Sequence, residues 1–212
     1  MRTNKIKQLW SEGKTVTLGW LSIADPFSAE VMARQGFDAL CIDLQHGATE
    51  LGTLLPMLQA VSQTDTSPVV RVPSNDPAVI MKALDLGAFS IIVPMINSAE
   101  EAAKAVSACR YPPRGTRSWG PTRAIHYAGA DYLAKADEEM LVIGMVETKE
   151  GLANIEAICA TPGLDAIYIG PSDLSLTLGG KPGLDHTEGK VVGAIDTILA
   201  GCKRHGVRAG LH

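Results

Sequence analysis

The segment SPVVRVPSNDPAVIMKALDLGAFSIIVPM, residues 67–95, contains a complete strand–helix–strand unit. Its two ends, 67–72 and 90–95, are almost continuously apolar, which is typical of strands buried on both faces in a parallel sheet. Between them, Asp76 is a suitable helix N-cap and Gly87 a suitable helix stop, so the pattern predicts a helix over 76–87. This order of elements indicates an α/β fold.

The same alternation extends in both directions along the chain. It predicts further strands at 16–22, 39–45, 141–147, 166–174 and 208–212, and helices at 25–36, 50 to about 62, 98–110, 148–163 and about 187–205. No G-x-G-x-x-G motif supports a dinucleotide fold, so we predict a single TIM (β/α)8 barrel domain over residues 1–212. Only seven strands are found, and we expect a barrel truncated before strand 8 and the C-terminal helix.

Composition narrows the class of protein. The 212 residues, 46% hydrophobic and 20% charged, fit a globular domain, and a net charge of −4 favours neither nucleic acid nor a membrane as partner. The four cysteines lie far apart without a C-x-x-C pair, and the N-terminus lacks the apolar core of a signal peptide. We expect a cytoplasmic protein with reduced thiols.

One segment, residues 111–139, is much longer than an ordinary connection between a strand and a helix. It contains Pro-Pro and Gly-Pro breaks, three arginines and Trp119. We interpret it as a shaped loop near the functional site, with 119–123 forming part of the pocket, and a flexible surface insertion is the alternative.

Polar groups gather where predicted strands end, which in such barrels is where sites are built. The groups come from four strands and are Asp43, Gln45 and His46, then Arg71, Glu147 and Asp173. Each also has a structural interpretation: His46 as a turn cap, Arg71 paired with Asp43 or Asp76, Glu147 as a helix cap, Asp173 within its own turn. Asp85, inside the helix at 76–87, has only a structural interpretation, as a solvated residue.

Glu147 and Asp173 end adjacent strands, about 4.8 Å apart in a sheet, so their carboxylates can share one hard cation such as Mg²⁺. A 2-oxo acid could chelate that ion, Arg71 could stabilise the enolate oxygen, and His46 could move protons. No lysine stands at a strand end to form a Schiff base.

Several motifs together resemble one family, the metal-dependent class II pyruvate aldolases, over essentially the whole chain. They are DLQHG (43–47), PVVRVPSNDP (68–77), IIVPMINSAEEA (91–102), RYPPRGTRSWGPTRA (110–124), GMVET (144–148) and GPSDLS (170–175). The family includes 4-hydroxy-2-oxoheptanedioate aldolase, 2-dehydro-3-deoxyglucarate aldolase and 2-keto-3-deoxy-L-rhamnonate aldolase. The resemblance implies a carbon–carbon lyase that reversibly cleaves a 4-hydroxy-2-oxo acid to pyruvate, or a close 2-oxo acid, and an aldehyde through a metal-bound enolate.

The resemblance also implies roles for individual residues. His46 corresponds to the acid/base residue with Asp85 as its paired acid, Arg71 to the enolate-stabilising arginine, and Glu147 and Asp173 to the ligands of Mg²⁺ or Mn²⁺, with Co²⁺ also accepted. The expected substrate-binding residues are Arg71, Ser172, Asp173, Trp20 and Leu211, and Asp43 and Gln45 are expected to support them. Family members are hexamers, so a homo-oligomer is expected.

Two departures bear on the substrate. Several relatives have Glu where this chain has Gln45, and some have Gln where it has Met145. The alternatives are a related lyase that cleaves an acyl-CoA ester such as malyl-CoA, and an inactive chain that binds metal and a 2-oxo acid without turnover.

Overall fold

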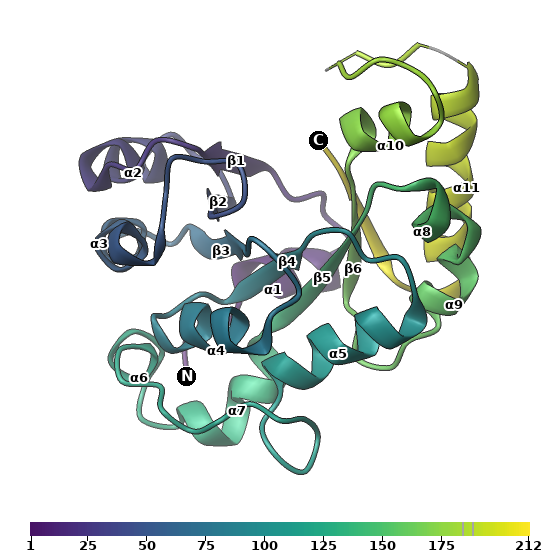
Figure 1. Cartoon of the computed structure of the whole chain (residues 1–212). Coiled ribbons are helices and arrows are strands. Elements are labelled where there is room, and N and C mark those ends of the chain that lie inside the picture. The colour runs from purple at the N-terminus through teal and green to yellow at the C-terminus, as the bar shows by residue number, and fades with distance from the viewer. Residues whose placement is uncertain (184, 188) are drawn as a thin grey trace.

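The computed structural model describes residues 1–183, 185–187 and 189–212 and contains one curled, fully parallel sheet (Figure 1). Its seven strands follow one another in chain order, each paired with the next. They are β1 (Leu18–Leu21), β2 (Ala39–Asp43), β3 (Ser67–Arg71), β4 (Ser90–Val93), β5 (Leu141–Val146), β6 (Ala166–Ile169) and β7 (Arg208–Leu211). The predicted barrel of parallel strands is confirmed.

The helices lie around the sheet, most of them on its outer face (Figure 1). They are α1 (Lys5–Ser11), α2 (Pro26–Ala33), α3 (Leu51–Val61), α4 (Pro77–Asp85), α5 (Ala99–Cys109), α6 (Ala124–Ala128), α7 (Tyr132–Glu139), α8 (Lys149–Ala153), α9 (Ile155–Cys159), α10 (Pro171–Thr177) and α11 (Gly189–His205). Among the described residues, no helix has the length and apolar character needed to cross a membrane.

The predicted helix signals have the expected physical basis. The carboxylates of Asp25 and Asp76 accept hydrogen bonds from the backbone N–H groups of Ser28 and Ala78. These N–H groups lie in the first helical turn and have no acceptor within the helix, so the caps satisfy them. Gly87 follows α4 with a φ of 106°, a left-handed conformation that glycine adopts without steric cost.

Alternate strand residues form two separate apolar clusters. Leu40, Ile42 and Val70 face outward and pack among the helices, whereas Cys41 and Val69 face inward. The inner cluster also receives Ile6 of α1, whose neighbour Asn4 donates from Nδ2 to the carbonyl of Phe89, just before β4 begins. The helix α1 therefore closes the N-terminal end of the barrel and leaves the C-terminal end of the strands open.

The barrel is not closed between β7 and β1, because among the described residues these two strands have no pairing with each other. A cavity of ≈ 560 Å³ lies at this opening, and its lining includes Leu18, Val69, Tyr168, Cys202 and Arg208. The place that an eighth strand would take is thus open to the barrel interior.

Besides the segment 111–139, three parts of the chain differ from the sequence-based expectation. The strand predicted over 166–174 ends at Ile169, because Pro171 begins the helix α10, so Asp173 lies in the first turn of a helix and not at a strand end. The predicted helix over 148–163 is interrupted at Asn154, which caps the end of α8 and the start of α9. The helix expected from about Thr187 begins at Gly189, and Glu188 lies outside the described residues.

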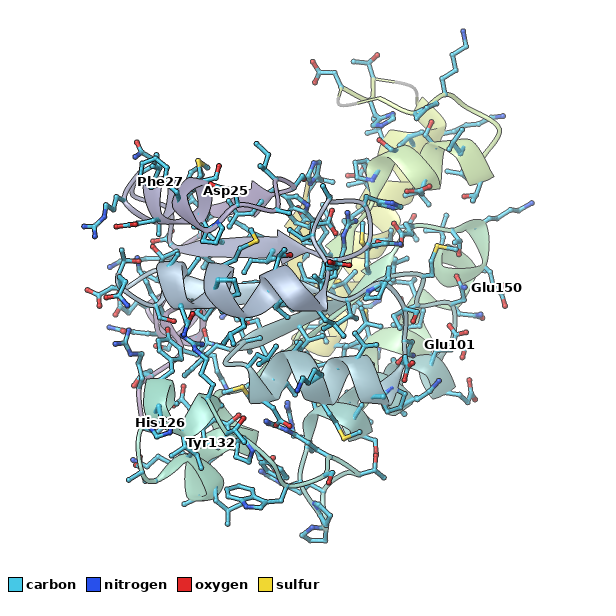
Figure 2. The ribbon with its side chains drawn as sticks, turned by 60° about the vertical axis from the view of Figure 1, so that its left-hand side comes forward. Asp25, Phe27, Glu101, His126, Tyr132 and Glu150 are labelled. Atoms are coloured by element: carbon cyan, nitrogen blue, oxygen red, sulfur yellow. The ribbon has the colours of Figure 1, made fainter. Side chains whose placement is uncertain are left out.

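The segment 111–139 is ordered into α6, α7 and a packed loop, but it lies away from α10 (Figure 1). Figure 2 shows Tyr132 and His126 in this region, far from the α10–α11 end of the molecule. Arg123 donates to the carbonyls of Leu86 and Leu58, where α4 and α3 end. Arg123 is bound to helix C-termini and Arg117 pairs with Asp85, so within one chain this loop does not lie near the site, contrary to the expectation.

Candidate active site

The two-residue repeat of the strands places charged groups on the inner face of the barrel. Along β2, Ala39 and Cys41 point inward, so Asp43 does as well, and along β3 Arg71 follows Val69 in the same way. Asp43 and Arg71 are also register partners in the β2–β3 pair. The end of β5 continues the pattern from Ile143 and Met145 to Glu147.

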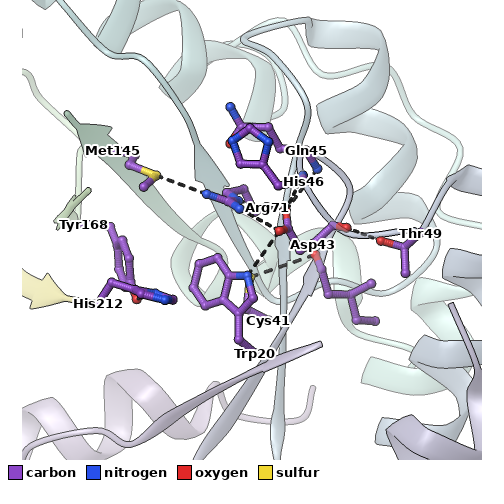
Figure 3. A network of polar contacts seen from close by, with 11 residues as sticks. Trp20, Cys41, Asp43, Gln45, His46, Thr49, Arg71, Met145, Tyr168 and His212 are labelled. Carbon is purple, nitrogen blue, oxygen red and sulfur yellow. Dashed lines mark hydrogen bonds and ion pairs between the residues drawn. The ribbon is translucent and has the colours of Figure 1, made fainter. Parts of the chain in front are cut away.

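Arg71 and Asp43 form a two-pronged buried ion pair (Figure 3). Arg71 Nε donates to Asp43 Oδ1 at 2.8 Å and Arg71 Nη2 donates to Oδ2 at 2.6 Å. Burial alone would raise the pKa of Asp43, but the hydrogen bonds and charge of Arg71 outweigh it and lower that pKa to about 2. Of the structural pairings open to Arg71, the structure selects the one with Asp43.

The carboxylate of Asp43 accepts further hydrogen bonds from other residues of the site. Trp20 Nε1 donates to Oδ2 at 3.2 Å, and the backbone N–H groups of Gln45 and His46 donate to Oδ1 at 3.0 and 3.3 Å. The Arg71 guanidinium also lies 4.9 Å from the centre of the Trp20 ring, within range of a cation–π contact. One carboxylate thus positions the arginine, the indole and the loop that carries His46.

The third guanidinium nitrogen of Arg71 is engaged only weakly. Its Nη1 donates to the Met145 sulfur at 3.8 Å, and a thioether is a poor acceptor. His46 is exposed in the same neighbourhood, above Arg71 in Figure 3. The side-chain oxygen of Gln45 is buried with no hydrogen-bond partner among the described residues.

Glu147 lies beside Arg71 and Asp173. It is 2% exposed, and its Oε1 accepts a hydrogen bond from the Met95 N–H at 2.9 Å. Burial and the negative charge of Asp173 raise the pKa of Glu147, whereas the Met95 N–H and the charge of Arg71 lower it, with a net upward shift. Glu147 does not cap α8, because Thr148 is the residue whose side chain accepts from Gly151 N–H.

The donor set suits a hard cation. Two carboxylates repel each other when both are ionised, and a divalent ion between them relieves that repulsion. Among the described residues there is no group of three or more His, Cys, Asp or Glu side chains that could hold a metal. Glu147 and Asp173 would supply two ligands. A Mg²⁺-type site with one or two carboxylates and open positions for water and substrate fits this pair.

Close backbone approach is needed to bring Asp173 next to Glu147. A Cβ atom at Gly170 would lie 2.6 Å from Glu147 Oε2 and 2.7 Å from the terminal carbon of Met145. Gly170 immediately precedes α10, whose first turn contains Ser172 and Asp173. Only a residue without a side chain fits here, which explains the glycine in the Gly-Pro-Ser-Asp segment.

The other expected substrate-binding residues lie in α10 and in β7. The Ser172 hydroxyl donates to the Gly183 carbonyl at 2.9 Å. The backbone N–H of Ser172, in the first turn of α10, is the group that remains available to a ligand. Leu211, in β7, is 54% exposed and lines the cavity between β7 and β1.

Asp85 is not brought to His46 within one chain. It is the last residue of α4, and its carboxylate pairs with Arg117 at 2.8 Å. Since α4 leads from the end of β3 back toward the start of β4, Asp85 lies at the N-terminal edge of the sheet, opposite the site. Its predicted role next to His46 therefore has no basis in the geometry of the single chain.

Three parts of the site have no clear signal in the sequence. Met95 has a left-handed backbone with a φ of 57°, which is uncommon for methionine and directs its N–H at Glu147. Tyr168 and His212 form an aromatic wall with Trp20, with ring centres 5.4 Å and 5.2 Å from the indole. The Tyr168 hydroxyl and His212 Nδ1 are 3.1 Å apart.

Fold and site together define an open parallel α/β barrel with an anchored arginine and two carboxylates where its strands end. The chain belongs to the HpcH/HpaI aldolase/citrate lyase family, whose model matches residues 17–210.

Named relatives of the chain are aldolases. It is 43% identical to the hydroxypyruvate/pyruvate aldolase of Rhizorhabdus wittichii, over 98% of this chain and 83% of that protein. It is 41% identical to the 4-hydroxy-2-oxovalerate aldolase of Rhodococcus jostii, over 96% of this chain and 81% of that protein. A crystal structure of an HpcH/HpaI aldolase/citrate lyase family protein from Burkholderia cenocepacia superposes with a TM-score of 0.91 and 35% identity, covering 99% of this chain and 84% of that one.

Proposed function

We propose that the protein is a divalent-metal-dependent aldolase that reversibly cleaves a 4-hydroxy-2-oxo acid to a 2-oxo acid and an aldehyde. The 2-oxo acid is pyruvate or hydroxypyruvate. The aldolase names of relatives at 43% and 41% identity support the reaction class. The observation that carries the proposal for this chain is Arg71, held by Asp43 through two of its nitrogens while its third remains available beside Glu147.

Glu147 and Asp173 would hold Mg²⁺ or Mn²⁺, which supplies Lewis acidity toward the keto oxygen of the substrate. Arg71 Nη1 can donate to the same oxygen as negative charge develops on it, because Met145 engages that nitrogen only weakly. A fixed guanidinium stabilises an enolate more effectively than a mobile one, since no reorganisation is needed as the charge forms.

The first turn of α10 is suited to the substrate carboxylate. The N–H groups of Ser172 and Asp173 have no helical acceptor at this position, so they can donate to an anion. Trp20 and Leu211 would border the apolar part of the substrate. Asp43 and Gln45 act indirectly, by holding Arg71 and the loop at 45–47.

His46 is the proposed proton carrier. It is exposed, so solvent can exchange its proton, and an imidazole can both accept and donate a proton. It would remove the proton from the 4-hydroxyl group during cleavage and return one in the aldol direction.

Exchange of pyruvate C3 protons with D₂O, followed by NMR, tests this function without knowledge of the aldehyde. We expect exchange with Mg²⁺ or Mn²⁺, loss with EDTA, and loss in R71A with metal binding largely retained. E147A should lose both exchange and metal affinity. H46A should also lose exchange, and H126A is its matched control, because His126 lies on α6, away from the site.

No exchange from the folded, metal-loaded protein with either pyruvate or hydroxypyruvate would refute the enolising site. Full exchange in R71A would remove Arg71 from the mechanism. Binding of metal and pyruvate without release of an aldehyde would instead identify a binding protein.

A further inference from the structure

Two thiols meet outside the site, between α9 and α11. Cys159 is the last residue of α9, and Cys202 lies near the end of α11. Their sulfur atoms are 3.8 Å apart, although 43 positions separate the residues in sequence. Cys41 and Cys109 have no such sulfur–sulfur contact among the described residues.

The two sulfurs are in van der Waals contact, so a bond between them requires only a short approach. A disulfide has an S–S distance of about 2.05 Å, so the sulfurs must approach by about 1.8 Å. Gly201 precedes Cys202 and faces α9: a Cβ atom there would lie 3.2 Å from Ile155 Cγ1. The missing side chain lets α11 approach α9 at the level of the thiol pair.

One of the two thiols also borders the open side of the barrel. Cys202 lines the ≈ 560 Å³ cavity between β7 and β1, and Lys203 and Arg208 line the same cavity. A small anionic reagent is therefore attracted to the side on which Cys202 lies. The hydrogen bond from Cys159 lowers the pKa of Cys202, which favours the thiolate at that sulfur.

We propose that Cys159 and Cys202 form a redox-sensitive dithiol that a small anionic disulfide converts to an intramolecular disulfide. The Cys202 thiolate attacks one sulfur of the reagent, breaks its S–S bond and releases one thiolate. The Cys159 thiolate then attacks Cys202 Sγ in the mixed disulfide and releases the second thiolate. Two electrons pass from the protein to the reagent, and the two protein thiol protons go to the two released thiols.

Peptide mapping after oxidation tests the proposal on the full chain. Oxidised glutathione is the reagent, remaining thiols are alkylated, and trypsin cleavage after Lys149, Lys190 and Lys203 places the two cysteines on separate peptides, 150–190 and 191–203. We expect these peptides to be cross-linked, and to separate again with dithiothreitol. The cross-link should be absent in C159A and C202A and retained in C109S, the matched buried thiol.

A second readout is thermal stability. A disulfide that joins α9 to α11 should raise Tm of the oxidised protein by at least about 4 °C over the reduced protein, with no such rise in C202A. Oxidised wild-type protein that carries only glutathione adducts on separate peptides would overturn the proposal. So would a cross-link that joins Cys41 or Cys109 instead, and both results stand even where an alanine variant fails to fold.

Discussion

Replacing Asp43 by asparagine tests whether this carboxylate is the residue that holds Arg71. The Arg71 and Asp43 side chains are 9% and 2% exposed, so the D43N variant leaves a buried guanidinium without its counter-charge. The amide also places an N–H₂ group against one of the two Arg71 donors, Nε and Nη2, that now find carboxylate oxygens. Removal of one partner from a buried ion pair costs about 3–5 kcal/mol of unfolding free energy.

Urea unfolding at pH 7, followed by circular dichroism, measures this loss. The matched control is E30Q, which breaks the exposed pair of Glu30 in α2 with Arg34, the residue that caps the end of this helix, and should cost less than about 0.5 kcal/mol. D43N should also lower the rate of pyruvate proton exchange at least about tenfold, because Arg71 is no longer fixed in the site.

The pH dependence has a defined sign. Arg71 lowers the pKa of Asp43 from 3.8 to about 2, so the pair contributes its full stability above about pH 4 and loses it as pH falls toward 2. The difference between wild-type protein and D43N should therefore narrow on acidification below about pH 4. A loss no greater than that of E30Q, or a difference that widens in acid, would refute the reasoning.

Two further substitutions test the packing of the site. G170A places a Cβ atom 2.6 Å from Glu147 Oε2, so we expect about 1–3 kcal/mol of destabilisation and weaker Mn²⁺ binding in a calorimetric titration. G193A is the control, since its Cβ would meet nothing within 4 Å. Unaltered Mn²⁺ affinity in G170A would contradict the close approach of Gly170 to Glu147. W20F keeps a ring beside Arg71 but removes the Nε1 donor to Asp43, so we expect a loss of about 1.5 kcal/mol of unfolding free energy in urea, smaller than that of D43N. A loss equal to that of D43N would contradict the view that Asp43 is held mainly by Arg71 and only secondarily by Trp20.

Local patterns in the sequence were sufficient for the positions of the strands and for most of the expected helix boundaries, although the strand expected over 166–174 ends at Ile169, where α10 soon follows. Apolar runs such as 39–42 and 90–93 are buried on both faces. A strand that lies between the barrel interior and a layer of helices is shielded from water on both sides, which favours apolar residues at nearly every position. The caps at Asp25 and Asp76 depend only on a side chain and the N–H groups next to it. The ends of the predicted strands likewise placed Asp43 and Arg71 at one edge of the sheet.

Contacts between distant segments were decided only by the tertiary structure. Asp85 has the same local helix whether it faces a site or a surface, and its partner Arg117 is 32 residues away in a loop without a periodic pattern. The left-handed Met95 and the meeting of Cys159 with Cys202 are equally invisible along the chain, because both depend on how neighbouring elements pack. Periodicity and capping act over a few residues, so the sequence alone determined the barrel and the edge that carries the charged groups. Which of those groups touch depends on the packing of the whole sheet and its helices, and only the folded chain decides it.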